Sequence, residues 1–212
     1  MSKRLGTNVT PSLALLRRHI LWNQRHRTAL FRRERSSGDT PRSRELALAQ
    51  LAELIAWLGW LRSSELFGLK WTDIVTCPPH NHKQFDLPTG VGAVLLRLLE
   101  STKTSQNKTV DVVIAWQTSL GLCIGEWMLI CRSLHPPHLS PFIFQDNNGD
   151  RWTSTTFRHK FLIPLLEYQR LEGDPYLTPY DGTTPGFSIS HIFYSLYSYR
   201  QGGRSDAPLK RM

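Results

Sequence analysis

The sequence is poor in cysteine and contains no long apolar run. Three cysteines, Cys77, Cys123 and Cys131, make an odd number, which argues against a disulfide scaffold and for a reducing intracellular compartment. The most apolar stretch, residues 46–61, is interrupted by two polar residues and a glycine, so we expect neither a membrane span nor a membrane partner. Because no phosphate-cradling glycine loop or Ser-His-Asp order stands out, we also expect no cofactor.

What the sequence does contain is enough for a packed core. It has 212 residues, of which 40% are apolar and 10% are aromatic. These values predict one main domain with a smaller appendage.

Positive charge is concentrated in residues 1–44. This segment holds eleven of the 26 Lys and Arg residues and two of the 17 acidic residues, and the difference of +9 equals the formal net charge of the chain. Because arginine forks onto phosphate oxygens and its binding releases counterions, the segment predicts a nucleic-acid partner. The candidate contacts are Arg17, Arg18, Arg25, Arg27, Arg32 and Arg33. An organelle transit peptide and a merely solvated arm are alternatives.

Two helices are predicted in the first third of the chain. Thr10 and Pro11 can begin a basic amphipathic helix. The polar stretch 32–41 lacks periodicity and predicts a linker, so we place a domain boundary near residue 42. Beyond it, apolar residues recur at helical spacing up to residue 61, with Thr40 and Pro41 as start signals. We therefore expect a basic helix-containing arm and linker, residues 1–42, and a main domain, residues 43–212.

The rest of the chain predicts a small sheet followed by helices. Strand-like runs lie at residues 74–76, 91–99 and 109–115. A helix is predicted from Trp116 to Leu134, ended by two prolines, then a turn at residues 147–149 and a helix through residues 157–165. A loop at 173–187 and an apolar run at 187–199 follow. The predicted fold class is mixed α/β, mainly α, with a three-stranded antiparallel sheet.

One segment carries a recognisable pattern. Residues 57–74 read WLGWLRSSELFGLKWTDI, which resembles the first signature of tyrosine recombinases, "tGLR-sEL-gL-W-Di". The resemblance implies a phage-integrase-like catalytic core in which Arg62 clamps the scissile phosphate and Glu65 supports the site. A guanidinium suits this role because phosphoryl transfer spreads negative charge over oxygens that a forked cation can bind.

A second segment lies at the separation that this resemblance requires. Residues 100–104, ESTKT, and the strand-like run 109–114 resemble the β-hairpin of the same family. Lys103 then stands where the family has its catalytic lysine, a general acid that protonates the departing 5′ oxygen. An ordinary hairpin lysine is the alternative interpretation.

The third signature of the family is altered here. Its H-x-x-R box aligns with Tyr197 to Arg200, so Arg200 is the second phosphate clamp while Tyr197 replaces the histidine. A phenol can donate a hydrogen bond to phosphate but cannot replace imidazole in acid-base chemistry near neutral pH. None of the twelve residues after Arg200 is the nucleophilic tyrosine, so we expect a recombinase core that is incomplete at its C-terminus. The ending RQGGRS resembles recombinases of eukaryotic mobile elements, which would imply a nuclear location.

Two other patterns have simpler interpretations. A zinc site is conceivable because two segments contain the ligands Cys77, His80, His82, Cys131, His135 and His138, but their spacing matches no known finger, so we expect no metal. Gly121 and Gly125 are interpreted as close-packing positions in the predicted helix.

Two classes of function remain. The first is DNA recombination or integration, with DNA and other recombinase protomers as partners and with cleavage lacking its nucleophile. The second is a non-catalytic DNA- or RNA-binding protein that keeps the scaffold and the basic arm.

Overall fold

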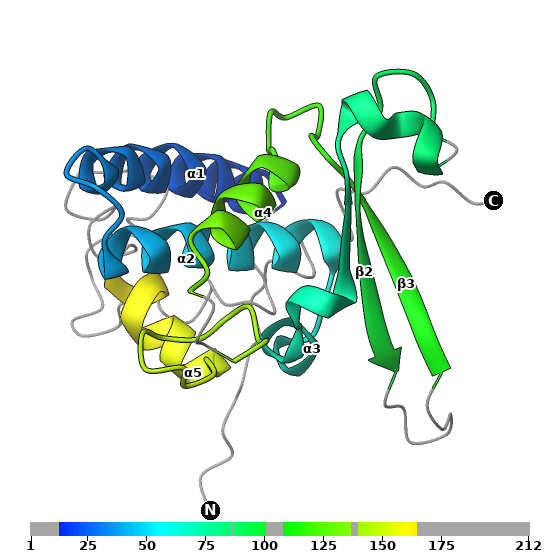
Figure 1. Cartoon of the computed structure of the whole chain (residues 1–212). Coiled ribbons are helices and arrows are strands. Elements are labelled where there is room, and N and C mark those ends of the chain that lie inside the picture. The colour runs from blue at the N-terminus through cyan, green and yellow to red at the C-terminus, as the bar shows by residue number, and fades with distance from the viewer. Residues whose placement is uncertain (1–12, 86, 101–107, 137–139, 165–212) are drawn as a thin grey trace, which may run out of the picture.

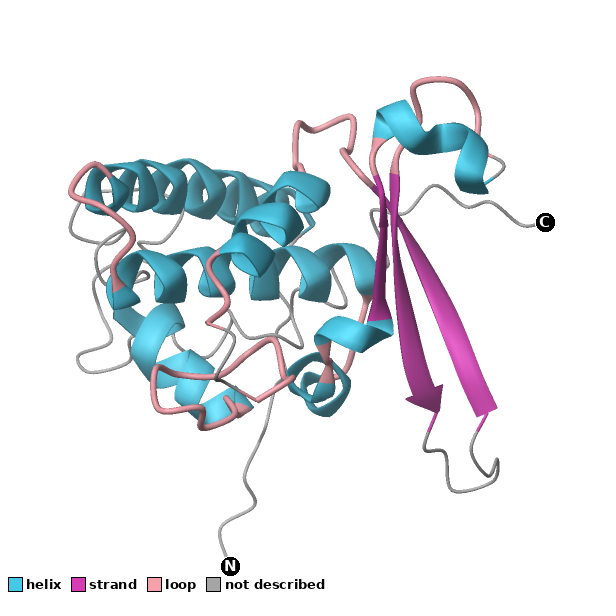
Figure 2. Ribbon diagram, in the orientation of Figure 1, coloured by secondary structure: helices cyan, strands magenta, loops and turns pink. Residues whose placement is uncertain are grey.

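A computed structural model describes residues 13–85, 87–100, 108–136 and 140–164 (Figure 1). Within them the chain is mixed α/β and mainly helical, with one three-stranded antiparallel sheet standing beside the helices (Figure 2). The coarse fold class predicted from the sequence is therefore confirmed. The predicted loop at 173–187 and the apolar run at 187–199 lie outside the described residues.

Helix α2 (Pro41–Gly59) forms the centre of the helical layer. It begins as predicted, because the Thr40 hydroxyl accepts a hydrogen bond from the Ser43 backbone N–H at 3.0 Å and Pro41 occupies the first turn. Most of its residues are buried, as expected for a helix that neighbours cover on several sides. It ends at Trp60, whose left-handed backbone (φ 55°, ψ 29°) turns the chain away.

Helix α1 (Leu13–Arg35) packs along α2 and shares its core. Ile20 and Phe31 are buried, and the Phe31 ring meets the Trp127 ring edge-on with centroids 5.3 Å apart. Only residues 36–40 separate α1 from α2, so the linker is shorter than the predicted one at 32–41. The helix of the basic arm is thus a structural part of the main domain.

The sheet consists of β1 (Ile74–Cys77), β2 (Ala93–Glu100) and β3 (Lys108–Ala115), in that order. All three predicted strands are present. The buried face carries Val94, Leu96 and Ile114, and it receives the end of α2 at Gly59, where a Cβ would lie 3.1 Å from the Ile114 Cδ1. The sheet is thereby fixed to the helical layer close to the point where α2 ends.

Helix α4 (Ile124–Ser133) is shorter than predicted. The sequence predicted a helix from Trp116, but residues 117–123 form a turn in which Gly121 has φ +78° and Gln117 bridges Cys123. Gly125 confirms the expected close packing, since a Cβ there would lie 1.9 Å from the Trp116 ring. Gly121 serves the turn instead, because its φ is one that other residues rarely adopt.

The remaining described segment, residues 140–164, lies below α2 in Figure 1 and contributes side chains to the core. The predicted turn at 147–149 is present, with Gly149 at φ +89° and a bridge between Gln145 and Arg151. Helix α5 (Ser154–Phe157) continues directly into the π-helical segment η3 (Arg158–Leu162), in agreement with the predicted third helix. Among the described residues, no helix is long and apolar enough to cross a membrane.

Candidate functional site

Arg62 lies at the junction of α2 and the short helix α3 (Ser63–Gly68). The left-handed turn at Trp60 and the buried side chain of Leu61 fix the chain on one side of it. Its own side chain is 56% exposed, so the guanidinium is open to a ligand.

Glu65 orients this guanidinium. Its carboxylate accepts a hydrogen bond from the Arg62 backbone N–H at 2.6 Å and another from Arg62 Nη1 at 2.7 Å. An arginine side chain has five N–H donors, and the structure shows no other bond from this guanidinium to a described residue. The group is therefore positioned while most of its donors are left for a phosphate or carboxylate oxygen.

The end of the β2–β3 hairpin at which residues 101–107 join the strands is the same end of the sheet at which α3 lies. The short segment η1 (Trp71–Asp73) connects α3 to β1 and contacts β2. Ile74 at the start of β1 pairs with Leu96, and β2 then runs four residues farther to Glu100, which pairs with Lys108 (Figure 1). Lys103 belongs to the residues that join the two strands there, and it lies outside the described residues.

Two further cations lie at the far end of α3. The Lys70 Nζ and the Arg151 guanidinium carbon are 5.4 and 5.2 Å from the centroid of the Phe142 ring. Both side chains are exposed. A cation over an aromatic face is held in place while its charge stays in contact with solvent.

The second arginine of the predicted phosphate clamp and the tyrosine that replaces the family's histidine are not placed by the structure. Arg200 and Tyr197 lie outside the described residues, so of the predicted catalytic set the structure places Arg62 and the supporting Glu65 alone.

The six predicted nucleic-acid contacts divide into three groups. Arg25, Arg32 and Arg33 are exposed on α1, as a phosphate contact requires. The side chains of Arg17 and Arg18 lie outside those the structure describes. Arg27 is a correction: its side chain is 3% exposed and its Nη2 lies 2.8 Å from Oε1 of the buried Glu53, so it serves the core.

The cysteines and histidines do not gather into a metal site in the part of the chain that the structure describes. Cys77 is buried with its Sγ 3.6 Å from the Asn81 carbonyl oxygen, while the His82 Nδ1 lies 3.0 Å from the Pro79 oxygen. Cys131 is buried elsewhere, on α4, and His138 lies outside the described residues.

Among the described residues, burial shifts the pKa of three titratable groups. It raises the pKa of the Cys131 thiol, and the neighbouring Arg44 opposes this shift. Burial likewise raises the pKa of Cys123 and lowers that of Arg44. Arg44 Nη1 is held by the Asp146 carbonyl oxygen and Asn147 Oδ1, each at 3.2 Å. Cys131 and Arg44 are buried and Cys123 packs against the core, so we assign all three a structural role.

Sequence reasoning missed one surface feature, a groove between α1 and the turn before α4. Its lining on α1 follows a polar stripe at helical spacing, Gln24, Thr28 and Arg32, which the sequence displays. Its other side, residues 120–122, was hidden because that stretch was predicted to be helical.

Comparison of the chain with protein-family models, curated proteins and solved structures found no match.

Proposed function

We propose that this protein binds DNA through a core of the tyrosine-recombinase type, with Arg62 as the first clamp on a backbone phosphate. The observation that carries the proposal is the geometry of Arg62, an exposed guanidinium held at 2.7 Å by Glu65 in the place where the sequence pattern puts the family's arginine and acid. Such a group binds two phosphate oxygens at once, which a free surface arginine does less well because it is not oriented.

The backbone at residue 60 supports the same proposal independently. In the pattern that residues 57–74 resemble, a glycine stands two residues before the arginine. Trp60 occupies this place and has φ 55°, a left-handed conformation that favours glycine. The chain therefore makes the turn that the glycine of the pattern would allow, although its own residue is unfavourable there.

The small antiparallel sheet gives the second line of support. Strands β2 and β3 pair as a hairpin, and their Glu100–Lys108 end, where we expect Lys103, is the end of the sheet near α3. In the proposed site Lys103 would protonate the departing oxygen and Arg200 would complete the clamp, with Tyr197 donating a hydrogen bond.

Strand cleavage also requires a nucleophile, which residues 201–212 do not supply. Binding and cleavage are therefore tested separately, and we expect binding from this chain without a covalent adduct. The second candidate function is non-catalytic DNA or RNA binding, which the exposed arginines of α1 favour.

The experiment compares Arg62→Ala with Arg97→Ala in duplex binding measured by fluorescence anisotropy. Arg97 is a matched control, since it is 59% exposed and also bonded to a carboxylate, that of Asp111. Loss of a charged phosphate contact should weaken binding about tenfold for Arg62→Ala, and Arg97→Ala should change little.

Two further arms separate the candidates. A nicked suicide duplex reports any covalent protein–DNA adduct, and a single-stranded RNA of equal length reports preference. Equal effects of the two arginine variants, or tighter binding to RNA, would favour the non-catalytic alternative. An adduct in the unmodified chain would overturn the expectation of binding alone.

A further inference from the structure

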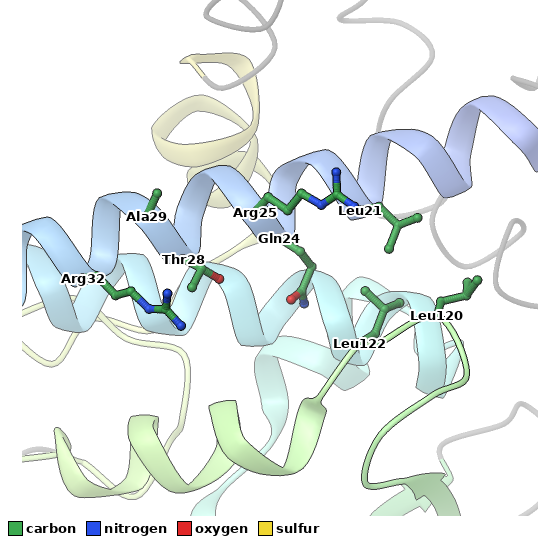
Figure 3. A pocket seen from close by; sticks show the side chains of 9 residues that line it. Leu21, Gln24, Arg25, Thr28, Ala29, Arg32, Leu120 and Leu122 are labelled. Atoms are coloured by element: carbon green, nitrogen blue, oxygen red, sulfur yellow. The ribbon is translucent and has the colours of Figure 1, made fainter.

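A groove on the surface lies between α1 and the turn before α4 (Figure 3). It encloses about 340 Å³ and is lined by residues 120–122 and by six residues of α1, Leu21, Gln24, Arg25, Thr28, Ala29 and Arg32. It lies on a different element from α3 and Arg62.

Its second wall is a rigid turn. The Thr118 N–H donates to the Leu122 oxygen at 2.9 Å, and the Leu122 N–H donates to the Thr118 hydroxyl at 3.1 Å. Gly121 supplies the positive φ that closes the turn. The groove is therefore bounded by a helix on one side and by a hydrogen-bonded turn on the other, and its shape does not depend on a loose loop.

The polar side chains of the lining are mainly donors. Arg25 and Arg32 are cations, neither forms an ion pair with another described residue, and no acidic residue lines the groove. The Gln24 Nε2 is buried and has no hydrogen-bond partner among the described residues. Figure 3 shows Gln24, Thr28 and Arg32 directed to the same side of α1. Two cations and an amide donor without a partner together favour binding of an anionic group that accepts hydrogen bonds.

We propose that this groove binds backbone phosphates of a nucleic-acid strand, as a second contact surface apart from Arg62. The proposal rests on the proposed function in taking nucleic acid as the polyanion. Arg25 and Arg32 are seven residues apart, a rise of about 10.5 Å along the helix. One strand of a duplex carries a phosphate about every 3.4 Å of its axis, so the two arginines span about three phosphates of a strand that follows α1.

The apolar residues of the groove fit the same ligand. Leu21 and Leu122 from its two walls and the 40% exposed Leu120 offer a surface against which sugar rings pack. Phosphate and sugar contacts of this kind position a strand without reading its sequence. An acidic peptide is the other polyanion that such a lining admits, and it forms one arm of the test.

The principal test is a matched pair of charge insertions. Leu120→Glu places a carboxylate in the groove, whereas Leu129→Glu places one on α4 at a residue that is 44% exposed and outside the groove. Both variants change the net charge equally, and neither residue is part of the core. We expect Leu120→Glu to weaken duplex binding by about tenfold in anisotropy at low salt, and Leu129→Glu by no more than about twofold.

A second pair tests the cations. Arg25→Ala with Arg32→Ala removes the two groove charges, and Arg35→Ala with Arg42→Ala removes two charges that already pair with Asp39 and Glu34. Loss of two phosphate contacts should reduce the slope of log affinity against log salt by about 1.8, at 0.9 per contact, in the groove double variant only.

The outcomes are distinguishable. If the protein binds DNA and each groove variant behaves like its control, the groove proposal is wrong while the proposed function stands. If the unmodified chain binds RNA but not DNA, the proposed function is wrong and the groove variants are measured on RNA; if it binds neither, both proposals are wrong. If a poly-glutamate peptide competes as well as an oligonucleotide of equal charge, the groove takes acidic peptides and the nucleic-acid assignment is overturned.

Discussion

At the residue scale, the core has no room for a side chain at Gly125. The Trp116 ring lies so close that a Cβ at position 125 would be 1.9 Å from its nearest atom. We expect Gly125→Ala to force the indole or α4 to move and to lower the free energy of unfolding by about 1–3 kcal/mol, measured by urea denaturation.

The control for this prediction is Gly68→Ala at the end of α3. A Cβ there would meet nothing within 4 Å, so the same substitution should be neutral or stabilise by about 0.4–1 kcal/mol. Equal losses in the two variants would mean that the contact with Trp116 is not what makes Gly125 necessary.

Cys131 gives a pH prediction at the same scale. Burial raises the pKa of its thiol above the value of about 8.5 expected in the unfolded chain. Below pH 8.5 both states keep the proton. Above it only the unfolded state releases the proton, so the stability should fall with rising pH by up to about 1.4 kcal/mol per unit for this group. Denaturation from pH 7 to 10 measures the slope, and Cys131→Ala should make it shallower.

The sequence predicted some of these residues and could not predict others. Gly125 was recognisable because a glycine inside an apolar helical run needs a packing reason. The burial of Arg27 had no such signal. A run of arginines predicts a solvated face, and only the fold brings Glu53, on another helix, close enough to pair with one of them.

At the scale of the element, the Arg27–Glu53 pair joins α1 to α2. Both side chains are almost fully buried, and the Asn23 amide also donates to the Glu53 carboxylate, at 3.2 Å. We expect Arg27→Ala to cost about 3–5 kcal/mol in unfolding free energy, because it leaves a buried carboxylate without its cation.

The double variant Arg27→Met with Glu53→Leu checks this reasoning. Removing both charges should recover much of the loss, since the buried carboxylate that loses Arg27 in the single variant is then gone as well. Arg35→Ala, which breaks an exposed pair with Asp39, should cost about 0.5 kcal/mol or less. If the double variant were no more stable than Arg27→Ala, packing rather than charge would explain the effect.

The elements themselves were predicted unevenly. Strands β1 to β3 and the start of α2 followed from alternation and capping signals. The start of α4 was misplaced because Trp116, Leu120 and Ile124 recur at helical spacing although the chain turns between them. Gly121 was the signal that could have corrected this, since glycine supplies the positive φ of a turn.

At the scale of the whole molecule, α1 belongs to the core although its sequence resembles a detachable basic arm. Removal of residues 1–35 would uncover the side of α2 that α1 covers. We expect that deletion to abolish cooperative thermal unfolding and to increase binding of a hydrophobic dye. The Arg25→Ala with Arg32→Ala variant should melt cooperatively. A cooperative transition in the truncated protein would show that the remainder folds without α1.

Because α1 belongs to the core, deletion of the basic segment is a poor test of the proposed DNA site. Loss of DNA binding on deletion of the basic segment would report unfolding as readily as loss of contacts, so point variants of exposed arginines are the informative ones. The sequence predicted Arg62 as a site residue, and the structure adds its orientation by Glu65. The sequence alone could not have predicted the groove, because its two walls are separated by about ninety residues of chain.

The backbone conformation of Trp60 makes this position a candidate for stabilising substitutions. A left-handed conformation costs a residue other than glycine about 1–2 kcal/mol, and here the bulkiest of the twenty side chains bears that cost next to Arg62. Selection for heat resistance alone should therefore replace Trp60. In a library randomised at this codon and screened for survival of heating, glycine and asparagine should become the commonest residues.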